Sequence, residues 1–121
     1  MTALKYEGAD MGVKVRDAGK IRIVDLSGKI ILGKSIQALD ETVAGLLKQN
    51  HNQIVLNLKD VDYIDSAGIG ELVASKKRAV AAGGDVKLLM PSSSVYQVLS
   101  IVQLHLIFEI LDDEAKAIGS F

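Results

Sequence analysis

The serine at position 66 is the side chain best placed for regulated chemistry, because it lies where strand periodicity gives way to helical periodicity. Before it, residues 54–58 form a short, mostly apolar run typical of a strand buried on both faces. Asp65 and Ser66 can both accept the free amide hydrogens of a first helical turn, so the simplest interpretation of Ser66 is a helix cap. The sharper interpretation is a phosphorylated hydroxyl, because a helix N-terminus tolerates added negative charge.

Small residues follow Ser66 directly and predict an accessible turn. They keep the first helical turn thin, so the hydroxyl should stand clear of bulky neighbours and the backbone of another protein could come close. Loops that leave the same end of a parallel sheet cluster, so residues 62–70 and 33–36 should form one partner surface. The contact residues expected from the turn are Asp62, Asp65, Ser66, Ala67, Gly68 and Ile69, and those expected from the loop are Gly33, Lys34 and Ser35.

The segment 28–35 offers a competing chemistry, because Gly28, Gly33, Lys34 and Ser35 match the phosphate-binding pattern G-x-x-x-x-G-K-S between a strand and a helix. A phosphate cradle turns its backbone amides inward and favours small residues, whereas positions 30–32 are Ile, Ile and Leu, which are more typical of core. At a strand end where a magnesium-binding acid is expected, the sequence has Asn57. Nucleotide binding therefore stays open as the minor alternative.

Other chemistries find little support in the composition. The two histidines, His51 and His105, have no second ligand at metal-binding spacing, and no G-x-S-x-G surrounds Ser66. There is no cysteine, so neither a disulfide nor a thiolate metal site is available. A net charge of -1 provides no basic surface for binding nucleic acid or anionic lipid. No apolar segment approaches the length of a membrane span. We expect a cytoplasmic protein without catalytic residues, metal or cofactor, and without nucleic acid or membrane as partner.

Alternating strands and helices predict an α/β fold with right-handed crossovers. Strands are expected at residues 11–16, 21–26, 53–58, 86–90 and 106–111, and helices near 35–49, 66–82, 92–102 and 113–121. The prediction is one domain over residues 11–121 after an N-terminal extension at 1–10, with a mixed, mainly parallel sheet of four to five strands covered by about four helices. The helix after Ser66 should bury Ile69, Leu72, Val73, Lys76 and Val80, and the last helix should bury Ala115, Ile118 and Phe121.

The chain resembles a stand-alone STAS domain of the anti-sigma-factor antagonist family from about residue 11 to its carboxyl end. The most specific likeness is the run from Tyr63 to Gly70, in which an Asp-Ser pair is followed by a small residue, Gly, an aliphatic residue and Gly. Supporting matches are residues 27–28, 54–58, 83–90 and 106–111. One position departs from the family pattern, since many relatives carry an acidic, kinase-contacting residue where this chain has Ile31.

The resemblance implies partner switching. The unphosphorylated protein would sequester an anti-sigma factor that is a serine kinase, which frees a sigma factor for transcription. The kinase would phosphorylate Ser66, the phosphoprotein would not bind, and a phosphoserine phosphatase would reset it. Ser66 would be a substrate, and the protein would not be an enzyme. The alternative within the fold is a STAS scaffold subunit of a larger signalling or transport assembly.

Overall fold

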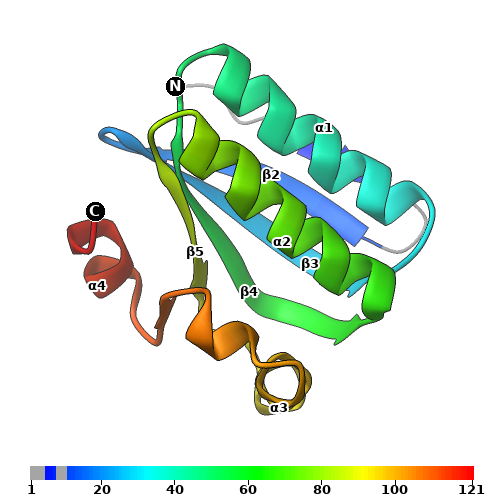
Figure 1. The fold of residues 1–121 in the computed structure, drawn as a ribbon. Coiled ribbons are helices and arrows are strands. Elements are labelled where there is room, and N and C mark those ends of the chain that lie inside the picture. The colour runs from blue at the N-terminus through cyan, green and yellow to red at the C-terminus, as the bar shows by residue number, and fades with distance from the viewer. Residues whose placement is uncertain (1–4, 8–10) are drawn as a thin grey trace.

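The structure is a computed structural model that describes residues 5–7 and 11–121 (Figure 1). The expected N-terminal extension at 1–10 therefore lies mostly outside the described residues. The strands are β1 Lys5–Glu7, β2 Met11–Ala18, β3 Ile21–Ile30, β4 Gln53–Ile64, β5 Asp85–Leu89 and β6 Ile110–Leu111. The helices are α1 Lys34–Lys48, α2 Ser66–Ala81, α3 Ser93–Ile101 and α4 Glu114–Gly119, with a short 3-10 helix, η1, at Leu104–Leu106.

The strands of the described chain form one mixed sheet in the order β1-β2-β3-β4-β5-β6. The β1–β2 and β2–β3 pairs are antiparallel, and the β3–β4, β4–β5 and β5–β6 pairs are parallel. The predicted fold class is confirmed. The sheet gains β1 from the segment that the sequence suggested was an extension. Because β3, β4 and β5 are parallel, the segments that follow them all leave from the same end of the sheet.

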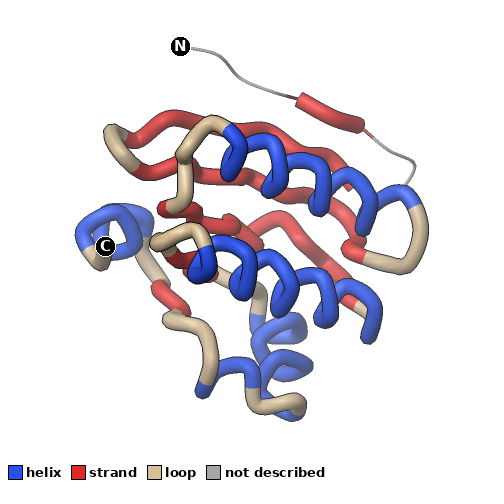
Figure 2. The backbone as a smooth tube through the Cα atoms, turned by 45° about the horizontal axis from the view of Figure 1, so that its top comes forward, coloured by secondary structure: helices blue, strands red, loops and turns tan. Residues whose placement is uncertain are grey.

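Helices α1 and α2 run side by side over one face of the sheet (Figure 1, Figure 2). The main core lies beneath them and includes Leu39 of α1, Leu56 of β4, Leu72 of α2 and Leu99 of α3, all fully buried. Helix α4 packs on a smaller cluster formed by Ile21, Ile23, Val55, Leu89 and Ala117. The two faces of the sheet differ in polarity at β2, where buried valines alternate with a lysine and an arginine that point to the opposite face.

Helix α2 ends where the sequence predicted, at the Gly83-Gly84 pair. Gly83 has a left-handed φ of 88°. Its N–H donates to the Val80 carbonyl at 3.0 Å, and the Gly84 N–H donates to the Ala79 carbonyl at 2.8 Å, which is a Schellman termination. The predicted inward stripe was wrong at Val80, which is 52% exposed. Ala79 lies almost two full turns after Leu72 and takes the core position, which leaves Val80 about 100° round the helix.

The C-terminal quarter departs most from the prediction. The expected strand at 106–111 is η1 followed by a two-residue β6, because Leu104 and Phe108 turn inward at helical spacing while Leu106 is exposed. A short apolar run does not distinguish a strand from a helical turn. In α4 the buried residue is Ala117, whereas Ala115 is exposed and Phe121 is 37% exposed.

Candidate partner-binding site

Asp65 connects the turn at Ser66 to the neighbouring loop. It is the N-cap of α2, and one carboxylate oxygen accepts from the Gly68 N–H at 2.8 Å. The other oxygen accepts from the Leu32 N–H at 3.0 Å, and the Asp65 N–H donates to the Ile30 carbonyl at 3.2 Å. The hydrogen bonds from the N–H groups of Leu32 and Gly68 lower the pKa of the Asp65 carboxyl below its ordinary value, so it stays ionised at neutral pH.

Ser66 is the first residue of α2 and is exposed. Because Asp65 supplies the capping oxygen, the interpretation of Ser66 as the cap was wrong. Its hydroxyl lies at the positive end of a helix of 16 residues, where a negative group is tolerated. This leaves the Ser66 hydroxyl available at the surface, in a backbone position that Asp65 already fixes.

The small residues after Ser66 do not share one role. Gly68 is buried, and a Cβ there would lie 2.3 Å from the Ile30 carbonyl oxygen and 2.7 Å from Cγ1 of Ile64. Gly68 therefore allows α2 to pack against the ends of β3 and β4, and it does not open the turn to a partner. Gly70 is exposed and would place its Cβ in open space. Ala67 and Ile69 are half-buried.

The loop after β3 brings some predicted contact residues to the surface and buries another. Gly33, with a left-handed φ of 115°, and Lys34 are exposed. Ser35 is only 3% exposed, because its hydroxyl accepts from the Ile31 N–H at 2.8 Å and donates to the Ile31 carbonyl at 2.6 Å. Its side chain therefore faces inward and is not available to a partner. Leu32 was expected in the core, yet it is 78% exposed.

The same contacts disfavour a phosphate-binding loop. Gly28 and Lys29 lie inside β3, so the first part of the motif is strand and not loop. The Ile31 N–H is already bound by the Ser35 hydroxyl, and the Leu32 N–H by the Asp65 carboxylate. A phosphate would have to displace both and would meet a carboxylate where the cradle needs donors.

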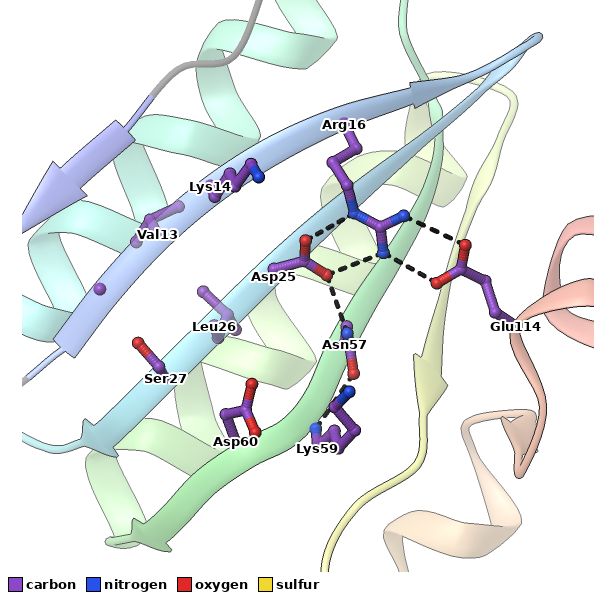
Figure 3. Close-up of a pocket in the computed structure, with 11 residues that line it drawn as sticks. Val13, Lys14, Arg16, Asp25, Leu26, Ser27, Asn57, Lys59, Asp60 and Glu114 are labelled. Atoms are coloured by element: carbon purple, nitrogen blue, oxygen red, sulfur yellow. Dashed lines mark hydrogen bonds and ion pairs between the residues drawn. The ribbon is translucent and has the colours of Figure 1, made fainter.

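A second polar cluster was missed by sequence reasoning, because its members come from four separate elements (Figure 3). Arg16 of β2 binds Asp25 of β3 at 2.6 and 3.0 Å and Glu114 of α4 at 2.8 and 3.1 Å. The Asn57 amide donates to Asp25 at 2.8 Å. These side chains line a hollow of about 360 Å³ on the sheet face that α4 partly covers. No short sequence spacing could have indicated the cluster.

The charges in this second cluster stabilise one another. The hydrogen bonds that the Arg16 guanidinium donates to Glu114 and Asp25 raise its pKa. Although burial alone would raise it, the pKa of Asp25 is lowered by hydrogen bonds from Arg16 and Asn57. The Arg16 hydrogen bonds also lower the pKa of Glu114. The Arg16 charge is thus matched by two carboxylates, which suits a structural link between α4 and the sheet better than a ligand site.

Neither histidine forms a catalytic arrangement with Ser66. His51 precedes β4, at the end of the strand opposite Ser66, and its Nε2 lies 3.3 Å from the Arg22 guanidinium. His105 lies on the exposed surface of η1. Within residues 5–7 and 11–121, no group of three or more His, Cys, Asp or Glu side chains is placed to hold a metal ion. No helix of the described chain is both long and apolar enough to cross a bilayer.

Comparisons with known proteins match both the sequence and the fold. The STAS domain model matches residues 13–117. A Thermotoga neapolitana protein, provisionally assigned as an anti-sigma factor antagonist, is 38% identical over 72 residues, covering 60% of this chain and 64% of that protein. The anti-sigma F factor antagonist of Paenibacillus polymyxa is 26% identical over 98 residues, covering 81% of this chain and 84% of that protein. The match to the Thermotoga protein thus leaves out more than a third of its length.

A solved structure agrees closely in architecture. The crystal structure of a Thermotoga maritima protein, provisionally assigned as an anti-sigma factor antagonist, superposes with a TM-score of 0.79 at 25% identity. The superposition covers 88% of this chain and 91% of that one. The fold around Ser66 is therefore not peculiar to this sequence.

Proposed function

The chain belongs to the STAS domain family, as the match over residues 13–117 shows, and we propose that it acts as an anti-sigma factor antagonist regulated at Ser66. One observation carries the proposal. The Ser66 hydroxyl is exposed at the start of α2 while Asp65 performs the capping, so the serine has no structural task that phosphorylation would disrupt. The relatives named as anti-sigma factor antagonists support the same assignment.

In the proposed cycle, the unmodified protein binds an anti-sigma factor that is a serine kinase and thereby frees a sigma factor. The kinase transfers the terminal phosphoryl group of ATP to the Ser66 hydroxyl oxygen, with loss of the hydroxyl proton, and ADP leaves. A phosphoserine phosphatase hydrolyses the ester and restores the binding form. This protein supplies a surface and a phosphate acceptor; it needs no cofactor or catalytic residue of its own, and it would act in the cytoplasm.

Electrostatics explains why the phosphoprotein would not bind. A partner that closes over Ser66 must remove water from the new dianion, and an unpaired buried charge can cost several kcal/mol. The neighbouring side chains Asp62 and Asp65 are acidic, so they offer the phosphate no compensating charge. A loss of about 3 kcal/mol is more than a hundredfold in affinity.

The proposed surface is smaller than the one expected from sequence. It keeps the exposed residues Asp62, Ser66, Gly33 and Lys34. The half-buried residues Asp65, Ala67 and Ile69 are retained at its margin, and the inward-facing Ser35 and Gly68 are left out. All of these segments leave the carboxyl end of β3 or β4, so one partner can cover them together.

The test begins with a pull-down from the native cytosol with unmodified protein, followed by identification of the partner and of modified residues by mass spectrometry. With the purified kinase and ATP, we expect phosphate on Ser66. In titrations, Ser66→Ala should bind constitutively and Ser66→Asp at least about tenfold more weakly, since the mimic has less charge than phosphate. Ser93→Asp is the matched control, because Ser93 is the exposed first residue of α3, directly after the capping Ser92. It follows β5, which ends opposite Asn57, seven residues before β4 reaches the Ser66 turn.

Two results would oppose the proposal. If Ser66→Asp binds a partner as tightly as the parent does, the protein is better described as a static scaffold. If calorimetry with ATP or GTP and magnesium shows saturable binding that Lys34→Ala abolishes, together with turnover, the protein is better described as a nucleotide-binding enzyme with a phosphate-binding loop.

A further inference from the structure

We propose that Leu32 is the apolar anchor of the partner surface, and that the kinase that covers Ser66 has an apolar pocket that receives it. This inference rests on the proposed function. Leu32 is 78% exposed, the highest value among the exposed large hydrophobic side chains of the described chain. An isolated exposed leucine needs no explanation by itself, so the argument depends on how this one is held.

Hydrogen bonds fix the backbone at Leu32 and at the residue before it. Its own N–H donates to the Asp65 carboxylate at 3.0 Å. The preceding residue, Ile31, has its N–H and its carbonyl bound by the single hydroxyl of Ser35, at 2.8 and 2.6 Å. The loop is therefore ordered before any partner arrives, and a side chain on an ordered loop loses less entropy on binding. A leucine held outward in this way is suited to fill a pocket.

Leu32 and Ser66 are held by the same carboxylate. One oxygen of Asp65 binds the Leu32 N–H, and the other binds the Gly68 N–H in the first turn of the helix that Ser66 begins. The positions of the leucine and the serine are thus fixed with respect to each other. Because Asp65 directly precedes Ser66 and binds the Leu32 amide, the loop that carries the leucine is a near neighbour of the serine, within reach of a protein that closes over the hydroxyl.

The charges around the loop favour a protein pocket over a lipid surface. Asp62 and Asp65 lie in the same turn as Ser66, and with Lys34 beside them the surface has no cluster of basic residues that would attract anionic headgroups. Hydrophobic anchors that enter pockets dominate protein interfaces, with polar residues forming the rim. Here Leu32 would be the anchor, and Lys34, Asp62 and Ser66 would lie around it. A charge added at Ser66 would then lie at the edge of the Leu32 contact, which in this proposal contributes most to the binding affinity.

The test uses two identical substitutions at matched exposure. Leu32→Ala should weaken binding to the purified kinase identified above at least about tenfold, and Leu32→Asp should weaken it further. Leu106→Ala should leave the affinity within about twofold. Leu106 is comparably exposed, at 72%, but it lies in η1, which leads into the edge strand β6, two strands away from β4 and the Ser66 turn. The melting temperatures of all three variants should match the parent, since neither leucine is buried.

The outcomes separate this inference from the proposed function. If the unmodified protein binds no serine kinase, the proposed function fails and the anchor fails with it. If the parent binds and is phosphorylated on Ser66 while Leu32→Ala binds equally well, only the anchor is overturned. If both alanine variants weaken binding equally, the effect is general apolar contact and Leu32 has no special role. A fall confined to Leu32 variants, seen also as a raised KM for Ser66 phosphorylation with little change in kcat, supports the anchor.

Discussion

Gly68 and Gly70 are two positions apart in α2, yet they should respond in opposite ways to the same added methyl group. At Gly68 the new Cβ would lie 2.3 Å from the Ile30 carbonyl oxygen, so Gly68→Ala must push α2 off the sheet. We expect the free energy of unfolding to fall by about 1–3 kcal/mol. At Gly70 the space is open, and Ala should stabilise the helix by up to about 1 kcal/mol. Urea denaturation of both variants measures this, and equal effects would contradict the packing.

The Asp65 carboxylate should make a pH-dependent contribution to stability. Asp65→Ala removes the cap and should cost about 1 kcal/mol at neutral pH, whereas Asp65→Asn keeps a capping oxygen and should cost less. Because the pKa of Asp65 is lowered in the folded state, its contribution is complete above the unfolded pKa of about 4 and is lost as pH falls through the folded value. Thermal melts of parent and alanine variant should therefore converge as pH falls below the unfolded pKa of about 4 and through the lowered folded pKa.

At this scale the sequence predicted an accessible serine at the start of a helix but not the roles of its neighbours. The Asp-Ser pair and the helix that begins after it could be predicted, because capping chemistry is local. The burial of Gly68 and Ser35 and the exposure of Leu32 could not be predicted from the sequence. Each depends on a contact across segments: Gly68 with Ile30, and the Leu32 amide with Asp65.

Helix α4 is held to the sheet by side chains at two places. Arg16 of β2 binds Glu114 in its first turn. Lys87 of β5, only 6% exposed, donates to the Ser120 carbonyl at 2.6 Å, pairs with Glu109 at 2.9 Å and lies 4.4 Å from the centre of the Phe121 ring. Because a helix of six residues has little stability alone, these contacts and the burial of Ala117 determine whether it stays docked.

Glu114→Gln should loosen α4 without unfolding the domain. The Arg16–Glu114 pair is about one-third exposed, so we expect a cost of only about 0.5–1 kcal/mol. Faster amide exchange should be confined to Glu114–Gly119. Since the pKa of Glu114 is lowered, the pair contributes fully above the unfolded pKa of about 4.3 and is lost as pH falls through the folded value. Uniformly faster exchange would show that α4 supports the whole core. Asp112→Asn is the control, because Asp112 is exposed and pairs at 3.4 Å with Lys116 of α4, so this change removes an ion pair of α4 that does not reach the sheet.

The elements with long, regular patterns were the ones that sequence could predict. Helices α1 and α2 have 15 and 16 residues with repeated apolar positions, and both begin within one residue of the expected site. The segment after α3 is short, and Gln103 adopts a left-handed φ of 62° that no local pattern indicates. Tertiary contacts of Leu104 and Phe108 decide its conformation, so its prediction as a strand was wrong.

For the whole molecule, we expect phosphorylation of Ser66 to change binding but not the fold. A phosphate at the positive end of α2 gains a few tenths to about 1 kcal/mol from the helix dipole, and repulsion from ionised Asp65 offsets a comparable amount. Melting curves of the purified phosphoprotein and of Ser66→Asp should therefore lie close to the parent curve. Loss of partner binding accompanied by a large fall in melting temperature would mean that unfolding, not charge, causes the loss.

The contact between Gly68 and Ile30 also bears on timing. Gly68 leaves no room for even one added carbon between the start of α2 and the end of β3, so the serine end of the helix is packed directly on the sheet. A phosphorylation switch on such a rigid platform would contain no internal delay, because no segment has to refold between the two states. The response time of the cell would then be set outside this domain, by how fast the kinase adds phosphate and how fast the phosphatase removes it.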